Sequence, residues 1–74
     1  MERLIGQLWQ ELLGVSEIGR FDNFFDVGGH SLLALRFLTR LEKRSGIRLL
    51  HEHVVAGTLQ QLAAKVEQMG GKAT

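Results

Sequence analysis

Apolar residues recur at helical spacing in three separate stretches of the chain. In the first stretch, from Glu2 to Leu13, they are Leu4, Ile5, Leu8, Trp9 and Leu12. This spacing is typical of an amphipathic helix with one buried face. Gly14 follows directly, and glycine at this position favours the end of a helix. We therefore predict a helix from Glu2 to Leu13.

The second stretch, from Ser31 to Ser45, predicts the longest helix. Its apolar stripe consists of Leu33, Ala34, Phe37, Leu38 and Leu41. Ser31 is placed to act as the N-cap of this helix and Gly46 to end it. Leu32 and Leu35 fall to the side of the stripe, so the core does not account for these two leucines.

The C-terminal part of the chain predicts a short helix and a longer one. From Ile47 to Ala56 the pattern is mixed, and we interpret it as a loop plus one short helix. Thr58 with Gln61 three positions later is a capping-box pattern, which predicts a last helix ending near Gln68 or Met69. We expect residues 70–74 to fray.

The connection from Val15 to His30 combines turn-forming residues with apolar ones. The apolar ones are Ile18, Phe21, Phe24, Phe25 and Val27. They are too apolar for a solvated linker, so we expect them to pack into the bundle and order the loop. A loop of this length in so small a domain is uncommon unless it is functional.

These elements predict an all-α fold in one domain covering residues 1–74. It is a small orthogonal or up-down bundle of three main helices and a short one, with a long ordered loop between the first two. The chain has 74 residues, 45% of them hydrophobic and 23% charged, a composition typical of a folded domain.

Composition also excludes several kinds of chemistry. There is no cysteine, and hence no disulfide, no thiolate nucleophile and no cysteine zinc site. The net charge of +1 provides no overall attraction to nucleic acid. No apolar run is long enough to cross a membrane and the N-terminus does not resemble a secretory signal, so we expect a cytoplasmic protein without membrane contact.

The segment from Asp26 to Leu32 contains the candidate chemistry. Gly28 and Gly29 allow the backbone to approach another molecule closely, and Ser31 follows at the start of a long helix. The N–H groups at a helix N-terminus favour a phosphate there. From these residues alone, Ser31 is either a simple N-cap or the attachment point of a phosphodiester.

The run Asp22-Asn-Phe-Phe-Asp-Val-Gly-Gly-His-Ser-Leu32, with the residues from Leu12 before it, resembles the peptidyl carrier (thiolation) domains of nonribosomal peptide synthetases. The resemblance covers almost the whole chain and implies an acyl-carrier-like fold. It implies that Ser31 carries 4′-phosphopantetheine covalently, next to Gly29 and His30. A histidine before the serine is more similar to peptidyl carriers than to acyl carriers, which usually have aspartate.

The resemblance also implies partners and a role. A phosphopantetheinyl transferase would use Mg²⁺ and coenzyme A to modify Ser31, and adenylation, condensation, tailoring or thioesterase domains would act on the resulting thioester. The domain itself would be a monomer with no catalytic residues. We expect partners to contact Leu32, Leu35 and either Val54 or Val55, because small exposed apolar patches often mark interaction sites. Alternatively, Leu32 and Leu35 contact the long loop.

The sequence departs from this family at two positions of the C-terminal half. Gly57 stands where family members often have proline before the last helix. Val54 or Val55 takes the place of the usual phenylalanine in the short helix. These departures concern the short helix and leave the Ser31 segment unaffected.

Other functions remain as alternatives. The chain could be an acyl carrier of a polyketide-type or hybrid pathway, or a helical interaction module without a carried group. A serine hydrolase built on His30 and Ser31 is disfavoured, because a nucleophile elbow needs glycine where Leu33 stands.

Two further alternatives rest on charged and metal-binding side chains. Four basic residues on the second predicted helix would suit a nucleic-acid binder, although a solvated basic face is the commoner explanation: Arg36, Arg40, Lys43 and Arg44. A metal site of His51, Glu52 and His53 is disfavoured, since neighbouring helical positions point apart and no further ligand is evident. We therefore expect no metal.

Overall fold

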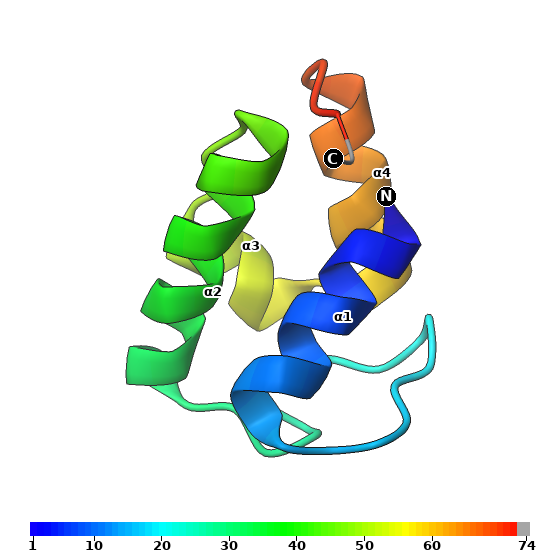
Figure 1. Ribbon diagram of the computed structural model, residues 1–74, viewed down its shortest axis with the longest axis vertical. Helices are drawn as coiled ribbons and strands as arrows, with labels where there is room; N and C mark the ends of the chain where they lie inside the picture. Colours follow the sequence, from blue (N-terminus) through cyan, green and yellow to red (C-terminus); the bar gives the residue numbers. More distant parts are fainter. Residues whose placement is uncertain (73–74) are drawn as a thin grey trace.

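The computed structural model describes residues 1–72, which form four helices. They are α1 (Glu2–Leu13), α2 (Ser31–Ser45), α3 (His51–Ala56) and α4 (Leu59–Gln68). Figure 1 shows α1 in front of the lower part of α4, with α2 on the other side of the molecule and the short α3 between α2 and α4. This arrangement confirms the predicted all-α bundle with a long ordered loop.

The core lies where the inner faces of the four helices meet the loop between α1 and α2. Three aromatic residues with no exposed surface form its centre: Trp9, Phe24 and Phe37. The ring centroids of Trp9 and Phe24 are 5.3 Å apart, and those of Phe24 and Phe37 are 5.7 Å apart. Such aromatic pairs stabilise a core beyond the area that they bury. Phe24 therefore anchors the loop in the centre of the bundle.

The predicted helix boundaries are confirmed. Both α1 and α2 end at a glycine with a left-handed backbone, Gly14 and Gly46. The α4 helix begins after Thr58 with the predicted capping box, in which the Thr58 hydroxyl accepts from the Gln61 N–H at 3.3 Å and the Gln61 carboxamide oxygen accepts from the Thr58 N–H at 2.9 Å.

The prediction that the chain frays from Gly70 is wrong for residues 70–72. The Gly71 N–H donates to the Val66 carbonyl at 2.9 Å, and the Lys72 N–H donates to the Ser45 carbonyl at 3.2 Å. The first bond closes the end of α4, and the second connects the residues after α4 to the end of α2. Residues 73–74, which the same prediction covered, lie outside the described residues.

The prediction that all the apolar loop residues pack into the bundle is wrong for one of them. Phe24 is buried, and Ile18, Phe25 and Val27 pack against the core. Phe21 is 74% exposed. The carbonyls of Arg20 and Asp22 on either side of it accept hydrogen bonds from the first turn of α4, which turns the Phe21 side chain outward.

No helix within residues 1–72 has the length and the apolar character needed to cross a membrane.

Candidate functional site

The loop that leads to Ser31 is folded tightly onto itself. The Asn23 carbonyl accepts from the Asp26 N–H at 3.0 Å and from the Val27 N–H at 3.3 Å. The Gly29 N–H then donates to the Phe24 carbonyl at 3.0 Å. Between these bonds, Gly28 has a φ of 109°, a conformation that side chains with a Cβ rarely adopt. The turn therefore depends on glycine at this position.

Gly29 lies directly against the buried Phe24. A Cβ at Gly29 would stand 2.4 Å from a ring carbon of Phe24 and 2.6 Å from the Phe24 carbonyl oxygen. Only glycine permits this close approach without a shift of the backbone or of the ring. Since Phe24 is fixed in the core, its contact with Gly29 determines where the chain enters α2, two residues later at Ser31.

The prediction that Ser31 caps α2 is wrong. His30 is the N-cap residue, with an extended backbone, and Ser31 is the first residue of the helix. Within residues 1–72 the Ser31 hydroxyl has no hydrogen-bond partner, and its side chain is exposed. The hydroxyl is therefore available at the surface, because it is not used to cap the helix.

The start of α2 favours an anionic group. The first backbone bond into the helix runs from the Ala34 N–H to the His30 carbonyl, at 2.8 Å. The N–H groups of the three residues before Ala34 have no backbone acceptor within residues 1–72. The first turn contains no acidic residue, and the last turn contains Lys43 and Arg44. Free N–H groups and the helix dipole together stabilise negative charge beside Ser31.

Exposed apolar side chains lie near this helix start. Leu32 is 55% exposed and Leu35 is 54% exposed, which confirms that they stand outside the core stripe. In α3, Val55 is 52% exposed whereas Val54 is fully buried. Val54 is therefore wrong as a candidate for partner contact, because its helical position turns it into the core, and Val55 remains.

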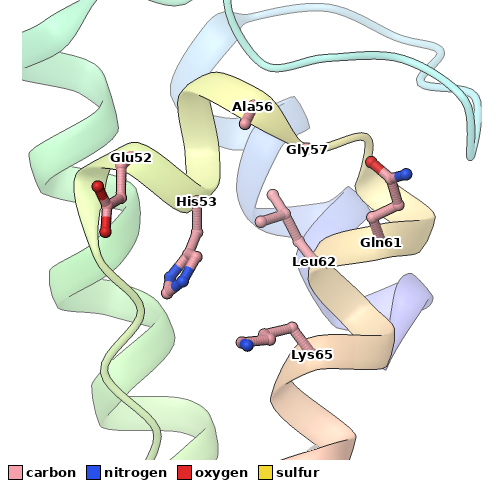
Figure 2. Close-up of a pocket in the computed structure, with 7 residues that line it drawn as sticks. All are labelled: Glu52, His53, Ala56, Gly57, Gln61, Leu62 and Lys65. Atoms are coloured by element: carbon pink, nitrogen blue, oxygen red, sulfur yellow. The ribbon is translucent and has the colours of Figure 1, made fainter.

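A groove of about 410 Å³ lies between α3 and α4 (Figure 2). It is lined by Glu52, His53, Ala56, Gly57, Gln61, Leu62 and Lys65. None of these residues comes from α2 or from the loop that leads to Ser31. The groove holds no serine, threonine or cysteine nucleophile. It is therefore separate from the candidate attachment site.

The three α3 residues that we considered as metal ligands have other surroundings. No group of three or more metal-ligating side chains gathers anywhere in residues 1–72. The His53 Nδ1 accepts from the Leu50 N–H at 3.0 Å, at the start of α3. The His51 ring packs edge-on against Phe25, with ring centroids 5.9 Å apart. Both histidines thus help to hold α3 in place.

Sequence reasoning missed one residue of this region, Asn23. Asn23 is one of the turn-forming residues of the predicted connection and part of the run that resembles peptidyl carriers. Its side chain bonds to α3 as well as to its own loop, which neither interpretation predicted. Nothing in the local sequence distinguishes it from the other turn-forming residues, because its partners are 31 to 34 positions away along the chain.

Comparisons with known proteins agree with this geometry. Residues 3–66 match the protein family described as the phosphopantetheine attachment site. A peptidyl carrier protein, solved in complex with the phosphopantetheine transferase Sfp and coenzyme A, superposes with a TM-score of 0.87 and is 34% identical, covering 90% of this chain and 88% of that one. The chain therefore belongs to the phosphopantetheine attachment family, as a carrier domain of the peptidyl carrier type.

Two curated relatives show the setting in which such domains occur. The chain is 45% identical over 67 residues to malpibaldin synthetase of Mortierella alpina, covering 89% of this chain and 1% of the relative. It is 40% identical over 68 residues to tyrocidine synthase 3 of Brevibacillus parabrevis, covering 90% of this chain and 1% of the relative. The chain thus spans a small part of these large proteins.

The expected resemblance, the carrier role and the phosphopantetheine cofactor are thereby confirmed. The residues at the start of α2 fit that cofactor. An exposed serine hydroxyl without a partner in residues 1–72 would serve as the attachment atom, and the free N–H groups beside it would suit the phosphate. Domains of this family carry a group between enzymes and do not catalyse a reaction themselves.

Proposed function

We propose that Ser31 is the residue that bears 4′-phosphopantetheine and that Gly29 and His30 present it. The observation that carries this proposal is the Ser31 hydroxyl, which is exposed at the first position of α2 and makes no hydrogen bond within residues 1–72. A phosphate on this oxygen would lie beside the free N–H groups of the helix.

In the attachment reaction, the only reacting group from this chain would be the accessible Ser31 hydroxyl. A separate transferase, with Mg²⁺, would remove the Ser31 proton, and the Ser31 Oγ would attack the phosphorus of the coenzyme A pyrophosphate that bears the pantetheine. An oxygen–phosphorus bond forms at serine, the pyrophosphate bond breaks and adenosine 3′,5′-bisphosphate leaves. The arm, once bound, supplies a terminal thiol that holds an acyl group as a thioester, which fits a chain without cysteine.

We infer that this carrier works in nonribosomal peptide synthesis, with aminoacyl or peptidyl groups on the arm. Support comes from the sequence likeness to the two large synthetases and from His30 in front of Ser31. Its partners would be adenylation, condensation, tailoring or thioesterase domains. Because coenzyme A is a cytoplasmic metabolite, a cytoplasmic location suits this role, with the carrier acting as a monomer.

Intact-protein mass spectrometry tests the attachment residue. The chain is incubated with coenzyme A, Mg²⁺ and the transferase Sfp, beside the Ser31→Ala variant. We expect one phosphopantetheinyl group on the parent chain and none on the variant. Addition to the variant, or none to a folded parent chain, would refute Ser31 as the attachment residue. Circular dichroism of both proteins shows whether they are folded.

We further propose that Leu32, Leu35 and Val55 form the partner-contact surface beside Ser31. Truncating a buried apolar anchor of an interface to alanine commonly weakens binding. Leu35→Ala and Val55→Ala should therefore raise the KM of Sfp for the carrier and leave kcat within about twofold.

The matched control for this surface is Met69→Ala. Met69 is also an exposed apolar residue, at 47%, but it follows α4. That end of α4 is bonded to the Ser45 end of α2, which is opposite to Ser31. An equal KM change in Met69→Ala and in the other two variants would contradict a specific contact surface.

A further inference from the structure

The Asn23 side chain joins the loop before Ser31 to the end of α3. Its Nδ2 donates to the carbonyl oxygens of Val54 at 3.2 Å, Val55 at 3.0 Å and Gly57 at 2.8 Å. Its Oδ1 accepts from the Phe25 N–H at 2.9 Å. Both ends of the carboxamide are therefore engaged, each with the type of partner that it requires.

On the α3 side, these bonds replace partners that the helix cannot supply. The α3 helix has six residues, too few to be stable by itself, and its last carbonyls have no N–H groups further along the helix. Asn23 donates to two carbonyls near the end of α3 and to the carbonyl of Gly57. Gly57 stands at the turn that leads from α3 into α4 (Figure 2). The C-terminal end of α3 is thus held from outside the helix.

On the other side, the same residue folds the loop that presents Ser31. The Asn23 backbone pairs with Thr58 in an isolated antiparallel bridge, and its carbonyl accepts from the Asp26 and Val27 N–H groups. The next residue is Phe24, whose ring lies against Gly29. Asn23 is therefore the point where the Ser31 loop and α3 are connected through polar bonds.

We propose that Asn23 is a positioning residue that fixes the exposed Val55 of α3 relative to Ser31, so that a partner meets both as one surface. The proposal rests on the proposed function of Ser31 and of the Leu32, Leu35 and Val55 surface. Asn23 itself contacts neither the attached group nor the partner. Its effect is transmitted through the carbonyls of α3.

Asn23→Asp tests this role with the least change in shape. The carboxylate still accepts from the Phe25 N–H, but it places an oxygen without a proton against the three carbonyl oxygens of α3 and the Gly57 turn. We expect the KM of Sfp for the carrier to rise about fivefold to tenfold, with kcat within about twofold, because recognition is impaired while the serine stays available.

A matched control is Gln10→Ala. The Gln10 Nε2 donates to the Ser16 carbonyl at 2.8 Å and so ties down the first half of the same loop, away from α3. This variant should lose one side-chain bond to the loop without a change in KM. If Asn23→Asp does not fold, as judged by circular dichroism, Asn23→Ser provides a second variant, since its side chain is too short to reach α3.

A double-mutant cycle distinguishes positioning from general destabilisation. If Asn23 acts through Val55, the KM increase caused by Asn23→Asp should shrink to within about twofold in a Val55→Ala background. Independent effects, in which the two KM increases multiply, would overturn the proposal, and so would an unchanged KM in Asn23→Asp. Failure of Sfp to modify the parent chain would instead refute the proposed function.

Discussion

Two helices of this domain begin near a hydroxyl residue, and they use it differently. At α4, Thr58 occupies the N-cap position and its hydroxyl bonds to the Gln61 N–H. At α2, His30 occupies the N-cap position, and Ser31 is the first residue of the helix. The Ser31 hydroxyl makes no hydrogen bond within residues 1–72. The first hydroxyl stabilises the fold, and the second is accessible to a partner.

The difference comes from the chain that precedes each helix. Before α4, the extended backbone of Thr58 pairs with Asn23, which leaves the Thr58 side chain above the first turn. Before α2, the contact of Gly29 with the Phe24 ring holds His30 in the extended conformation and starts the helix at Ser31. A shift of one residue at the helix start therefore separates a hydroxyl that caps its helix from one that is exposed and unbonded.

Moving the hydroxyl of α2 to the N-cap position should have the largest effect. The double variant His30→Ser with Ser31→Ala places a serine where Thr58 stands in α4. We expect complete loss of phosphopantetheine addition by mass spectrometry, together with a gain of about 0.5–1 kcal/mol in stability from the new cap. His30→Ser alone should still be modified. Addition to the double variant would show that one residue of displacement does not matter.

Removing the glycine that sets the start of α2 should have the next largest effect. Gly29→Ala forces a Cβ against the Phe24 ring and should lower the free energy of unfolding by about 1–3 kcal/mol, as overpacking of a core does. Urea denaturation measures this change.

The control for this prediction is Gly6→Ala within α1, where the nearest atom would be at 3.7 Å. Alanine there should be neutral or stabilise the protein by about 0.5–1 kcal/mol, because glycine is unfavourable within a helix. Equal effects of the two alanine substitutions would contradict the close packing that we describe at Gly29.

Local patterns in the sequence were sufficient to predict most of this fold. The helical spacing predicted α1, α2 and α4, and the capping box at Thr58 was confirmed with both of its bonds. The outward position of Leu32 and Leu35 followed from the same periodicity. In each of these cases the residues that determine the outcome are neighbours in the sequence.

The features that sequence reasoning missed depend on residues far apart in the chain. Phe21 is exposed because its flanking carbonyls bond to α4, a contact that the apolar character of the side chain cannot predict. The role of Asn23 likewise depends on carbonyls of the distant α3. The displaced cap at His30 is a different case, because Gly29 and Phe24 are near neighbours in the sequence. Their contact depends on the Phe24 ring, which is fixed by its burial among the helices.

Removing the cap of α4 should have a moderate effect that is confined to stability. Thr58→Ala eliminates the hydroxyl that accepts from the Gln61 N–H and should cost about 1 kcal/mol. The rate of phosphopantetheine addition should stay unchanged, since Ser31 belongs to a different helix. Thermal denaturation and the transferase assay on the same sample check both statements. A slower addition without loss of stability would contradict the separation of the two roles.

The smallest effect on stability is expected at the start of α1, where an exposed ion pair stands in place of a side-chain cap. This helix also has no side-chain cap, and its first turn is instead tied to the loop by an ion pair of Glu2 and Arg20 at 3.0 Å. Both side chains are partly exposed, so the pair is screened by water and salt. Glu2→Gln should lower the free energy of unfolding by at most about 0.5 kcal/mol at low ionic strength. In about 1 M salt the loss should be nearly zero, because the Debye length there is about 3 Å. Urea denaturation at both salt concentrations measures this difference.

A larger and salt-independent loss of stability in Glu2→Gln would contradict this prediction. It would mean that Glu2 stabilises α1 as strongly as Thr58 stabilises α4, and that an exposed charge can substitute for a cap.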